Sequence, residues 1–418
     1  MKLSNFSFKE DPVGTEFDKN EIIAITKLLK SKNILTRGVY IEKFEKQIAR
    51  YCNQKYAIAV SSCGAALNLS SKVLSLKPKD EVICQGNMFW SAINHLIEKK
   101  VKIVCADIDK NLNISVPHVQ KIISKKTKAI YIMHHGGYPC DLAPLRMLAR
   151  KFSIPIVEDC AHALGSVYKG KKIGATSDLA CFSFSTLKNI STLGEGGMIV
   201  TNNKTFAKRA RLLRTNFALT KISKDLTLEK KFKIKFNDLK SFTNVGSSWE
   251  DEVLSVDEIG GTHRMNEAQA ATGIHQLKKI NKLINKRKKI VKKYNNFFKR
   301  KKNLFEIIQC DTKKTRSSNH LYSFLLKKNK FFTRNELANE LIANNIEIRI
   351  RFSPIHFNNL MRFYGCKISD CKKCFGLPSL EDIWLNRQMS LPLSPHKNDK
   401  DIEKMFIIFS SIIDRLTK

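Results

Sequence analysis

The chain has 418 residues, of which 43% are hydrophobic and 9% aromatic, and it carries a net charge of +36. Such a composition supplies a packed core, which excludes a disordered chain. The sequence contains no apolar run of the roughly 18 residues that a membrane-spanning helix needs, and it opens without the apolar stretch of a signal peptide. Eleven cysteines without regular spacing predict free thiols. We therefore expect a cytoplasmic protein.

The positive charge is spread along the whole chain as short groups of lysines. Runs such as Lys286–Lys289 and Lys299–Lys302 fit solvated helix faces, and the sequence shows no helix-turn-helix, zinc-finger or RNA-recognition signature. We therefore predict no nucleic-acid partner. A basic field also favours small phosphorylated ligands, and this is the interpretation we prefer.

In the first half of the chain, short β-branched runs alternate with amphipathic segments. Helices are predicted over residues 20–31, 65–76, 116–123 and 142–151. Strands are predicted over residues 56–60, 81–84, 101–106, 129–133, 154–157, 180–184 and 198–201. This alternation predicts an α/β fold with a mostly parallel sheet flanked by helices.

The second half begins with a polar stretch, 216–258, that is too long for an ordinary connection and is expected to be a flap or insert. A long helix is predicted over residues 266–294. Beyond it, strands at 322–326 and 346–350 and helices at 334–344 and 399–415 predict a smaller α+β domain. We expect a large α/β domain over 1–280 and a small domain over 281–418.

The segment Ile154–Thr201 carries the clearest chemistry. A buried strand leads to Glu158–Asp159, and a second strand leads through Ser183 to Lys188, which is followed by a Gly-Glu-Gly-Gly turn. Ligands of α/β folds bind at the carboxyl ends of such strands. Pyridoxal phosphate needs a lysine, a carboxylate for its ring nitrogen, phosphate donors and a flat partner for its ring. The segment therefore predicts a site for this cofactor.

The remaining parts of that site lie earlier in the chain. Residues 61–66 (SSCGAA) join a strand to a helix, where free N–H groups and the positive helix end suit a phosphate. Phe89 follows the next strand and is available to stack on the ring, with Trp90 as an alternative stacking partner. Other interpretations remain open: Asp159 as a helix cap, Phe89 as a core residue and Ser183 as an ordinary strand end.

With these motifs the sequence resembles the DegT/DnrJ/StrS-type nucleotide-sugar aminotransferases, which have the pyridoxal phosphate-dependent fold type I of aspartate aminotransferase. The resemblance covers nearly the whole chain. It rests on the segments SSCGAAL, MHHGGYPCD, EDCAHALG, FSFSTLKN, GEGGMIV, HRMNEAQAATGIHQL, HLY, PIH and SLPLSP.

The resemblance implies a role for each matching residue. Lys188 would carry the cofactor covalently, Asp159 would pair with the ring nitrogen, and His162 would contact the hydroxyl side of the ring, unless it is simply a packed histidine. Phe89 would stack on the ring. The phosphate would be held by Ser183 together with the backbone at Gly64 and Ala65. His320 and His356 receive no role.

The resemblance also implies a homodimer with shared active sites, which moves an amino group, usually from glutamate, to a keto group of a nucleotide-linked sugar. Two other functions remain open: a transaminase acting on a keto-cyclitol or another non-nucleotide carbonyl, and a regulatory or nucleic-acid-binding protein on the same fold. Arg349 or Arg351 is a candidate to reach a diphosphate-bearing substrate.

The chain departs from the family at two positions. The family reads Gly-Thr where this chain has Cys63–Gly64, so a phosphate-binding hydroxyl is missing. The family's cross-subunit asparagine is Thr262 here, which leaves that phosphate contact open.

The cysteines Cys366, Cys371 and Cys374 raise the alternative of a metal site, with His356 or His396 as a further ligand. Chance clustering of reduced thiols is the interpretation we favour, so no metal is expected.

Overall fold

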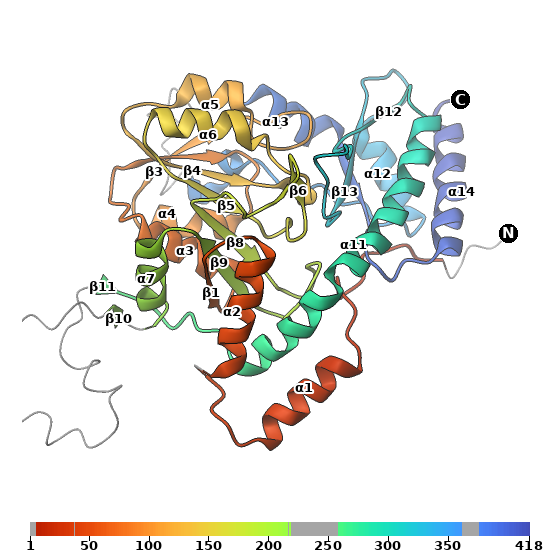
Figure 1. Ribbon diagram of the computed structural model, residues 1–418. Coiled ribbons are helices and arrows are strands. Elements are labelled where there is room, and N and C mark those ends of the chain that lie inside the picture. The colour runs from red at the N-terminus through yellow and green to blue at the C-terminus, as the bar shows by residue number, and fades with distance from the viewer. Residues whose placement is uncertain (1–5, 37, 216, 219–257, 362–375) are drawn as a thin grey trace, which may run out of the picture.

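The structure is a computed structural model of the chain and describes residues 6–36, 38–215, 217–218, 258–361 and 376–418. Its centre is a seven-stranded sheet (Figure 1). The strands are β1 (Tyr56–Val60), β2 (Glu81–Gln85), β3 (Lys102–Ala106), β4 (Thr127–Met133), β5 (Ile156–Asp159), β8 (Leu179–Ser183) and β9 (Gly197–Thr201). Their order is β1-β9-β8-β5-β4-β2-β3, and only β9 runs antiparallel to its neighbours. The predicted α/β class with a mostly parallel sheet is confirmed.

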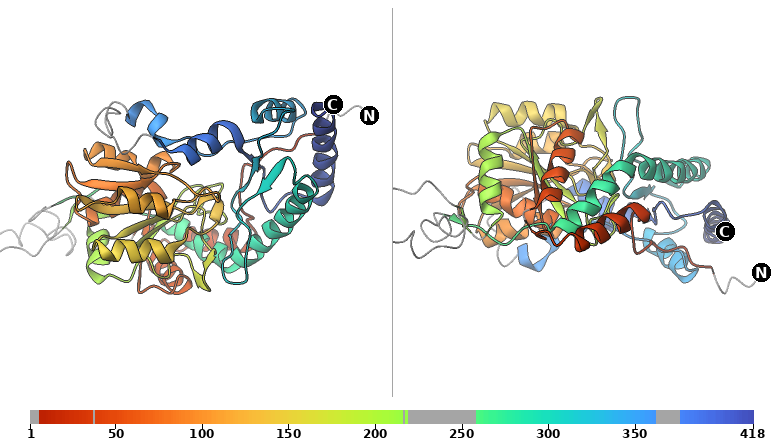
Figure 2. Two further views of the ribbon diagram at one scale, coloured as in Figure 1. Left: turned by 90° about the horizontal axis from the view of Figure 1, so that it is seen from above. Right: turned by 60° about the horizontal axis from the view of Figure 1, so that its bottom comes forward.

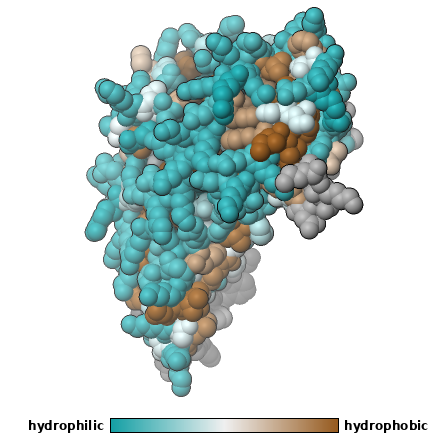
Figure 3. All heavy atoms as spheres, turned by 90° about the vertical axis from the view of Figure 1, so that its right-hand side faces the viewer, coloured by the Kyte–Doolittle hydropathy of each residue, from teal (hydrophilic) through white to brown (hydrophobic). Residues whose placement is uncertain are grey.

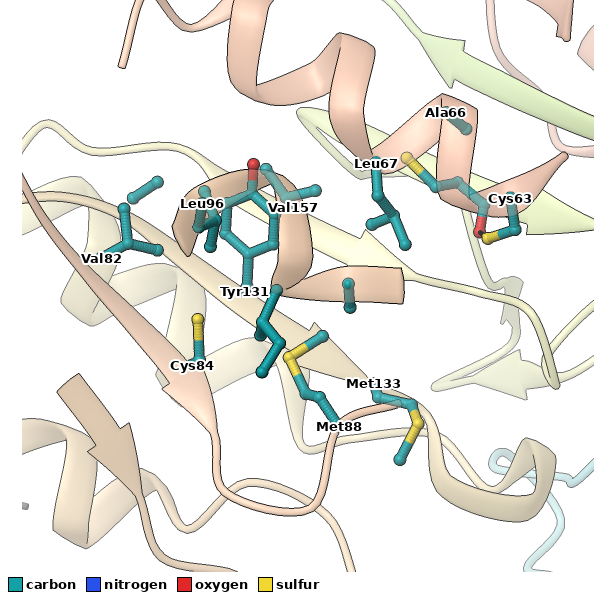
Figure 4. Packing of buried hydrophobic residues seen from close by; sticks show 14 of the residues in the cluster. Cys63, Ala66, Leu67, Val82, Cys84, Met88, Leu96, Tyr131, Met133 and Val157 are labelled. Atoms are coloured by element: carbon teal, nitrogen blue, oxygen red, sulfur yellow. Dashed lines mark hydrogen bonds between the residues drawn. The ribbon is translucent and has the colours of Figure 1, made fainter. Parts of the chain in front are cut away.

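Helices cover both faces of this sheet because its strands are apolar on both sides. The helices are α2 (Val39–Tyr51), α3 (Cys63–Val73), α4 (Asn94–Glu98), α5 (Val116–Ile122), α6 (Leu142–Lys151) and α7 (Lys204–Leu213). Successive residues of β4 point to opposite faces. Tyr131 packs with the α3, α4 and α7 side, whereas Ile130 and Ile132 pack with the α2, α5 and α6 side. In Figure 4, Tyr131 lies close to Leu96 and Val157 within the first of these cores.

A 34-residue helix, α11 (Glu267–Arg300), runs from the large sheet to the C-terminal part of the chain (Figure 2). It begins at Asn266, whose side chain accepts a hydrogen bond from the Gln269 N–H while the Gln269 side chain bonds back, a capping box. The first half of α11 packs in the core of the large sheet, and residues from Ile290 onward belong to a separate core. α1 (Lys19–Lys30) packs along α11.

The C-terminal part has its own antiparallel sheet, with α12 (Arg334–Ala343) and α14 (Asp399–Leu416) packed against it. Its strands are β12 (Phe305–Ile307), β13 (Tyr322–Leu326) and β14 (Gln388–Leu391). Stacked phenylalanines fill its core, with the Phe298 and Phe324 ring centroids 4.2 Å apart. The expected boundary at residue 280 falls within α11, so that division stays a prediction.

The remaining elements are short. They are β6 (Val167–Tyr168), β7 (Lys171–Lys172), β10 (Phe217–Ala218), β11 (Glu258–Ile259), α13 (Pro378–Asp382) and the single turns at Trp90–Ala92, His135–Gly137, Ile355–Phe357 and Ile383–Arg387. Most of the expected insert at 216–258 lies outside the described residues. Its two ends pair with each other as β10 and β11.

One predicted strand is wrong. Residues 346–350 form isolated bridges instead, from Ile346 to Phe8 and from Arg349 to Ser390. The two bridges reach different partner segments, so no continuous ladder forms, although the apolar alternation of this segment is that of a strand.

Within the part of the chain that the structure covers, no helix is long and apolar enough to cross a membrane. The face that carries α14 is mostly hydrophilic (Figure 3). The eight cysteines of the described ranges are all free thiols.

Candidate active site

A cavity of about 510 Å³ opens at the carboxyl ends of β5 and β8, beside the first turn of α3. This is the sheet edge at which α/β folds bind ligands. Six of the seven predicted site residues line it: Gly64, Phe89, Asp159, His162, Ser183 and Lys188. The strand ends and the helix start thus converge on one space, as the sequence predicts.

Asp159 is the last residue of β5 and is buried. Its Oδ1 accepts a hydrogen bond from the Ala161 N–H at 2.9 Å and lies 3.8 Å from the Cys63 thiol. Residues 160–165 contain turns and no helix, so this hydrogen bond closes a turn and the alternative of Asp159 as a helix cap is wrong. Burial raises the pKa of Asp159, and the Ala161 N–H and the charge of Lys188 oppose this shift only in part. A cationic partner would stabilise this carboxylate further.

Glu158, the other member of the acidic pair, faces away from the cavity. Its carboxylate pairs with His134 Nε2 at 3.1 Å and with the Arg146 guanidinium at 3.0 Å, and it is fully buried. Burial alone would raise the pKa of Glu158, but His134 and Arg146 bring that pKa below its ordinary value. Adjacent residues of a strand point to opposite faces, so only one of the two acids reaches the ligand space.

Lys188 lies in the turn between β8 and β9, where its N–H donates to the Ser185 carbonyl at 3.0 Å. Among the described residues, its amine makes no ion pair and no hydrogen bond. Burial lowers the pKa of Lys188, against the opposing charge of Asp159, and Arg351 lowers that pKa further. The amine therefore exists in its nucleophilic neutral form over a wider pH range than that of an exposed lysine.

His162 forms part of an aromatic cluster at the cavity wall. Its ring stacks on His320, with centroids 4.4 Å apart at 29°, and on Phe352, with centroids 5.8 Å apart at 18°. Burial brings the pKa of both histidines well below the ordinary value, which favours the neutral form of both rings. The Nδ1 atom of His162 has no hydrogen-bond partner. His320, which has no role in the sequence prediction, thus sits beside the predicted ring-contacting residue.

Phe89 lies on the cavity wall with half of its side chain exposed (50%). Its ring lies 5.6 Å from that of Phe352, edge to face. The alternative stacking partner Trp90 packs against the core of the large sheet instead. Phe89 is therefore not a core residue. Of the two candidates Phe89 and Trp90, it is Phe89 that is available to stack on a planar ligand.

The first turn of α3 and the end of β8 supply polar groups to the same space. Ser62 caps the helix: its hydroxyl accepts from the Ala65 N–H at 3.1 Å. That amide, which the sequence assigns to a phosphate, is therefore already engaged, and Ala65 does not line the cavity. The N–H of Gly64 has no partner among the described residues. The Ser183 hydroxyl accepts from the Ser185 N–H at 3.4 Å.

Twelve further residues line the cavity without a place among the seven predicted site residues, and of these Ser91, Arg349, Arg351 and Phe352 also lie outside the sequence motifs. The twelve are Ser62, Cys63, Ser91, Met133, Ala161, Ser185, Leu187, Glu195, His320, Arg349, Arg351 and Phe352. Arg349 and Arg351 are the two arginines suggested as substrate contacts, and both reach the cavity. Each forms an ion pair with Glu10, that of Arg349 at 3.3 Å. In the sequence, the alternation of apolar and basic residues around Arg349 and Arg351 is the only signal that marks the segment that contains them.

The cysteine cluster Cys366, Cys371 and Cys374 lies outside the described residues. Both histidines proposed as its partners are engaged elsewhere: His356 Nε2 pairs with Glu381 at 3.1 Å, and His396 Nε2 with the Thr15 carbonyl at 2.8 Å.

The residues present fit pyridoxal phosphate. A buried carboxylate suits the ring nitrogen, an unpaired amine suits the aldehyde, and the free N–H of Gly64 with nearby hydroxyls suits the phosphate. The unpartnered Nδ1 of His162 suits a polar ring substituent. The part that each residue plays toward the cofactor stays a prediction.

Comparisons with known proteins agree with this geometry. The model of the DegT/DnrJ/EryC1/StrS aminotransferase family matches residues 15–409. The chain is 32% identical to the spore coat polysaccharide biosynthesis protein SpsC of Bacillus subtilis, covering 94% of this chain and 95% of that protein. It is 31% identical to GDP-perosamine synthase of Escherichia coli O157:H7, covering 90% and 91%. The solved structure of Helicobacter pylori PseC, an aminotransferase of pseudoaminic acid biosynthesis, has a TM-score of 0.81 at 26% identity and covers 97% of this chain and 100% of its own.

Proposed function

Because this chain belongs to the DegT/DnrJ/EryC1/StrS aminotransferase family and is a pyridoxal phosphate-dependent enzyme, we propose that it transfers an amino group from glutamate to a keto group of a nucleotide-linked sugar. The observation that carries this proposal is the unpaired Lys188 amine in one cavity with the buried Asp159 carboxylate. The relatives named for perosamine and spore coat polysaccharide synthesis support a place in amino-sugar and surface polysaccharide biosynthesis.

Each proposed role follows from the position of the residue. When bound, pyridoxal phosphate accepts the electron pair of the breaking Cα–H bond of the donor. Asp159 holds the ring nitrogen through a charge-assisted hydrogen bond, which is strong because the carboxylate is buried. His162 and Phe89 confine the ring from the cavity walls.

Lys188 would hold the cofactor, and its neutral amine would move the proton of the donor. The lowered pKa favours the neutral amine, which is the form that accepts a proton from carbon. Arg349 and Arg351 line the same cavity as this amine, and their guanidinium groups would stabilise a carboxylate or a diphosphate by charge.

The proposal includes a homodimer in a reducing cytoplasm. The free thiols support the compartment. The dimer is supported by the exposed apolar side chains Ile22, Ile23 and Leu29 of α1, which suit a protein partner better than water.

The test offers the purified holoenzyme glutamate and a panel of acceptors: UDP- and GDP-linked keto-hexoses and a keto-cyclitol. We expect an aminated nucleotide sugar by mass spectrometry with the wild type and none with Lys188→Ala. Borohydride reduction followed by peptide mapping should place the cofactor on Lys188.

Four other outcomes would contradict the proposal. Amination of the cyclitol alone would replace the nucleotide-sugar assignment. Salt-dependent binding of duplex DNA without transamination would favour a regulatory protein. Cofactor trapped on another lysine, or turnover retained by Lys188→Ala, would remove the site.

A further inference from the structure

Gly64, in the first turn of α3, leaves room in the cavity wall that a neighbouring side chain occupies. A Cβ atom at Gly64 would lie 3.3 Å from Ser91 Cβ and 3.9 Å from Ser91 Oγ. The first distance is tighter than an ordinary contact, so a side chain at Gly64 and the side chain of Ser91 compete for the same space. The family resemblance implies a threonine at the position that Gly64 occupies in this chain.

The Ser91 hydroxyl is available for a ligand. Ser91 lies in the turn Trp90–Ala92 and lines the cavity beside Gly64. In the described part of the chain its Oγ has no hydrogen-bond partner, whereas the hydroxyl of Ser62 accepts from the Ala65 N–H and that of Ser183 from the Ser185 N–H. Ser91 is therefore a free donor next to the free N–H of Gly64.

We propose that Ser91 replaces the missing threonine and that its hydroxyl donates a hydrogen bond to the phosphate of the cofactor, beside the N–H of Gly64. Ser91 lies in the turn Trp90–Ala92 after β2 and not in the first turn of α3, but it lines the same cavity as Gly64. This inference rests on the proposed function, which places the phosphate at the start of α3. The helix N-terminus there favours a dianion, and the hydroxyl adds a charge-assisted hydrogen bond.

If Ser91 replaces a threonine at position 64, variants at the two positions should compensate for each other. Ser91→Ala should weaken the affinity for pyridoxal phosphate roughly ten- to hundredfold, the range expected for losing one hydrogen bond to a charged group. Affinity for pyridoxal, which lacks the phosphate, should not change. Gly64→Thr alone should also weaken binding because of the contact with Ser91. The double variant Ser91→Ala/Gly64→Thr should regain most of the affinity.

The experiment dialyses each holoenzyme against graded pyridoxal phosphate or pyridoxal and reads occupancy from the absorbance of the bound cofactor. Thermal unfolding of each variant shows whether it folds. If Gly64→Thr does not fold, the affinities of Ser91→Ala for pyridoxal phosphate and pyridoxal test the inference on their own. Ser411→Ala, an exposed serine of α14, is the matched control.

Each outcome points one way. Unchanged pyridoxal phosphate affinity in Ser91→Ala would overturn the inference, as would an equal loss for pyridoxal, which indicates a packing defect. A folded double variant that binds pyridoxal phosphate no more tightly than Ser91→Ala would also contradict the proposal that Ser91 replaces the threonine. If the wild type carries no cofactor on Lys188, the proposed function itself fails, whereas normal loading with an unaffected Ser91→Ala removes only the role of Ser91.

Discussion

At the scale of single residues, Glu158 and Asp159 are adjacent acids on one strand with different surroundings. One pairs with groups of the protein, and the other faces the cavity. Glu158 is satisfied by His134 and Arg146 within the protein. Asp159 accepts one backbone N–H and otherwise faces the cavity. The pKa of Glu158 is lowered because its partners outweigh burial, whereas that of Asp159 is raised because burial outweighs the groups that stabilise its charge.

Matched amide substitutions at these two positions should therefore behave in opposite ways. Asp159→Asn removes the charge opposite the cofactor ring, so we expect turnover to fall by about a hundredfold or more, with little change in thermal stability. Glu158→Gln removes the buried negative charge that pairs with the Arg146 guanidinium and should cost about 3–5 kcal/mol of unfolding free energy. Steady-state kinetics and denaturant unfolding measure the two effects. Wild-type turnover in Asp159→Asn would contradict the assignment.

The lowered pKa of Lys188 gives a second prediction at this scale. In cofactor-free protein, labelling of Lys188 by an amine reagent should reach half its maximum at a pH below 10.5, the ordinary value for lysine. Below that midpoint the amine is protonated and unreactive. The charge of Asp159 raises the pKa of Lys188, so Asp159→Asn should move the midpoint lower still.

Peptide mapping of the label across pH measures the midpoint for Lys188 separately from every other lysine. A midpoint at or above 10.5, or an upward shift in Asp159→Asn, would show that burial does not control this amine.

At the scale of elements, α2 and α11 approach so closely that only glycine fits between them. A Cβ atom at Gly273 would lie 2.5 Å from the ring of Phe44. In an exposed helix, Gly→Ala gains about 1 kcal/mol. Here we expect Gly273→Ala to destabilise the protein by about 1–3 kcal/mol, because overpacking outweighs helix propensity.

Denaturant unfolding of a double-mutant cycle with Phe44→Leu checks this explanation. The smaller side chain should relieve the contact, so Gly273→Ala should cost less in the Phe44→Leu background. Equal costs in both backgrounds would place the strain elsewhere.

The sequence could predict elements whose signal is local. The strands ending at Asp159 and Ser183 are short buried runs beside turn residues, and Lys188 follows within the same segment, so its place near Asp159 follows from strand order. The failed strand at 346–350 shows the limit, because its partners, Phe8 and Ser390, lie in separate parts of the chain. Alternation shows that a segment can pair but does not identify its partner.

At the scale of the whole molecule, the cavity combines a wall from the large sheet with residues from the C-terminal part of the chain. Arg351, Phe352 and His320 reach it from beyond α11, and Glu10, which pairs with Arg351, comes from near the N-terminus. Arg351, Phe352 and Glu10 lie outside the motifs of the sequence, and the HLY segment of His320 does not by itself indicate a place near Asp159. Their presence in the cavity depends on the packing around α11, which the pattern of one segment cannot reveal.

The apolar face of α1 belongs to the same scale. α1 buries Ala24 and Leu28 toward α11, yet Ile22 and Ile23 remain 66% and 59% exposed. Figure 3 shows hydrophobic side chains near the lower end of the molecule, which is where α1 lies in Figure 1. Water is an unfavourable neighbour for such a cluster, and a second copy of the chain would cover it.

A charge placed on this face should separate the two copies. We expect wild-type protein to sediment as a dimer and Ile23→Lys to dissociate at least about tenfold more readily, because burying an unpaired ammonium costs more than the interface regains. Ile407→Lys, at a 71% exposed isoleucine on α14, is the control and should remain dimeric. Sedimentation velocity over a concentration series measures both. If each site needs its neighbour, turnover of Ile23→Lys should recover as concentration rises, and an intact Ile23→Lys dimer would place the interface away from α1.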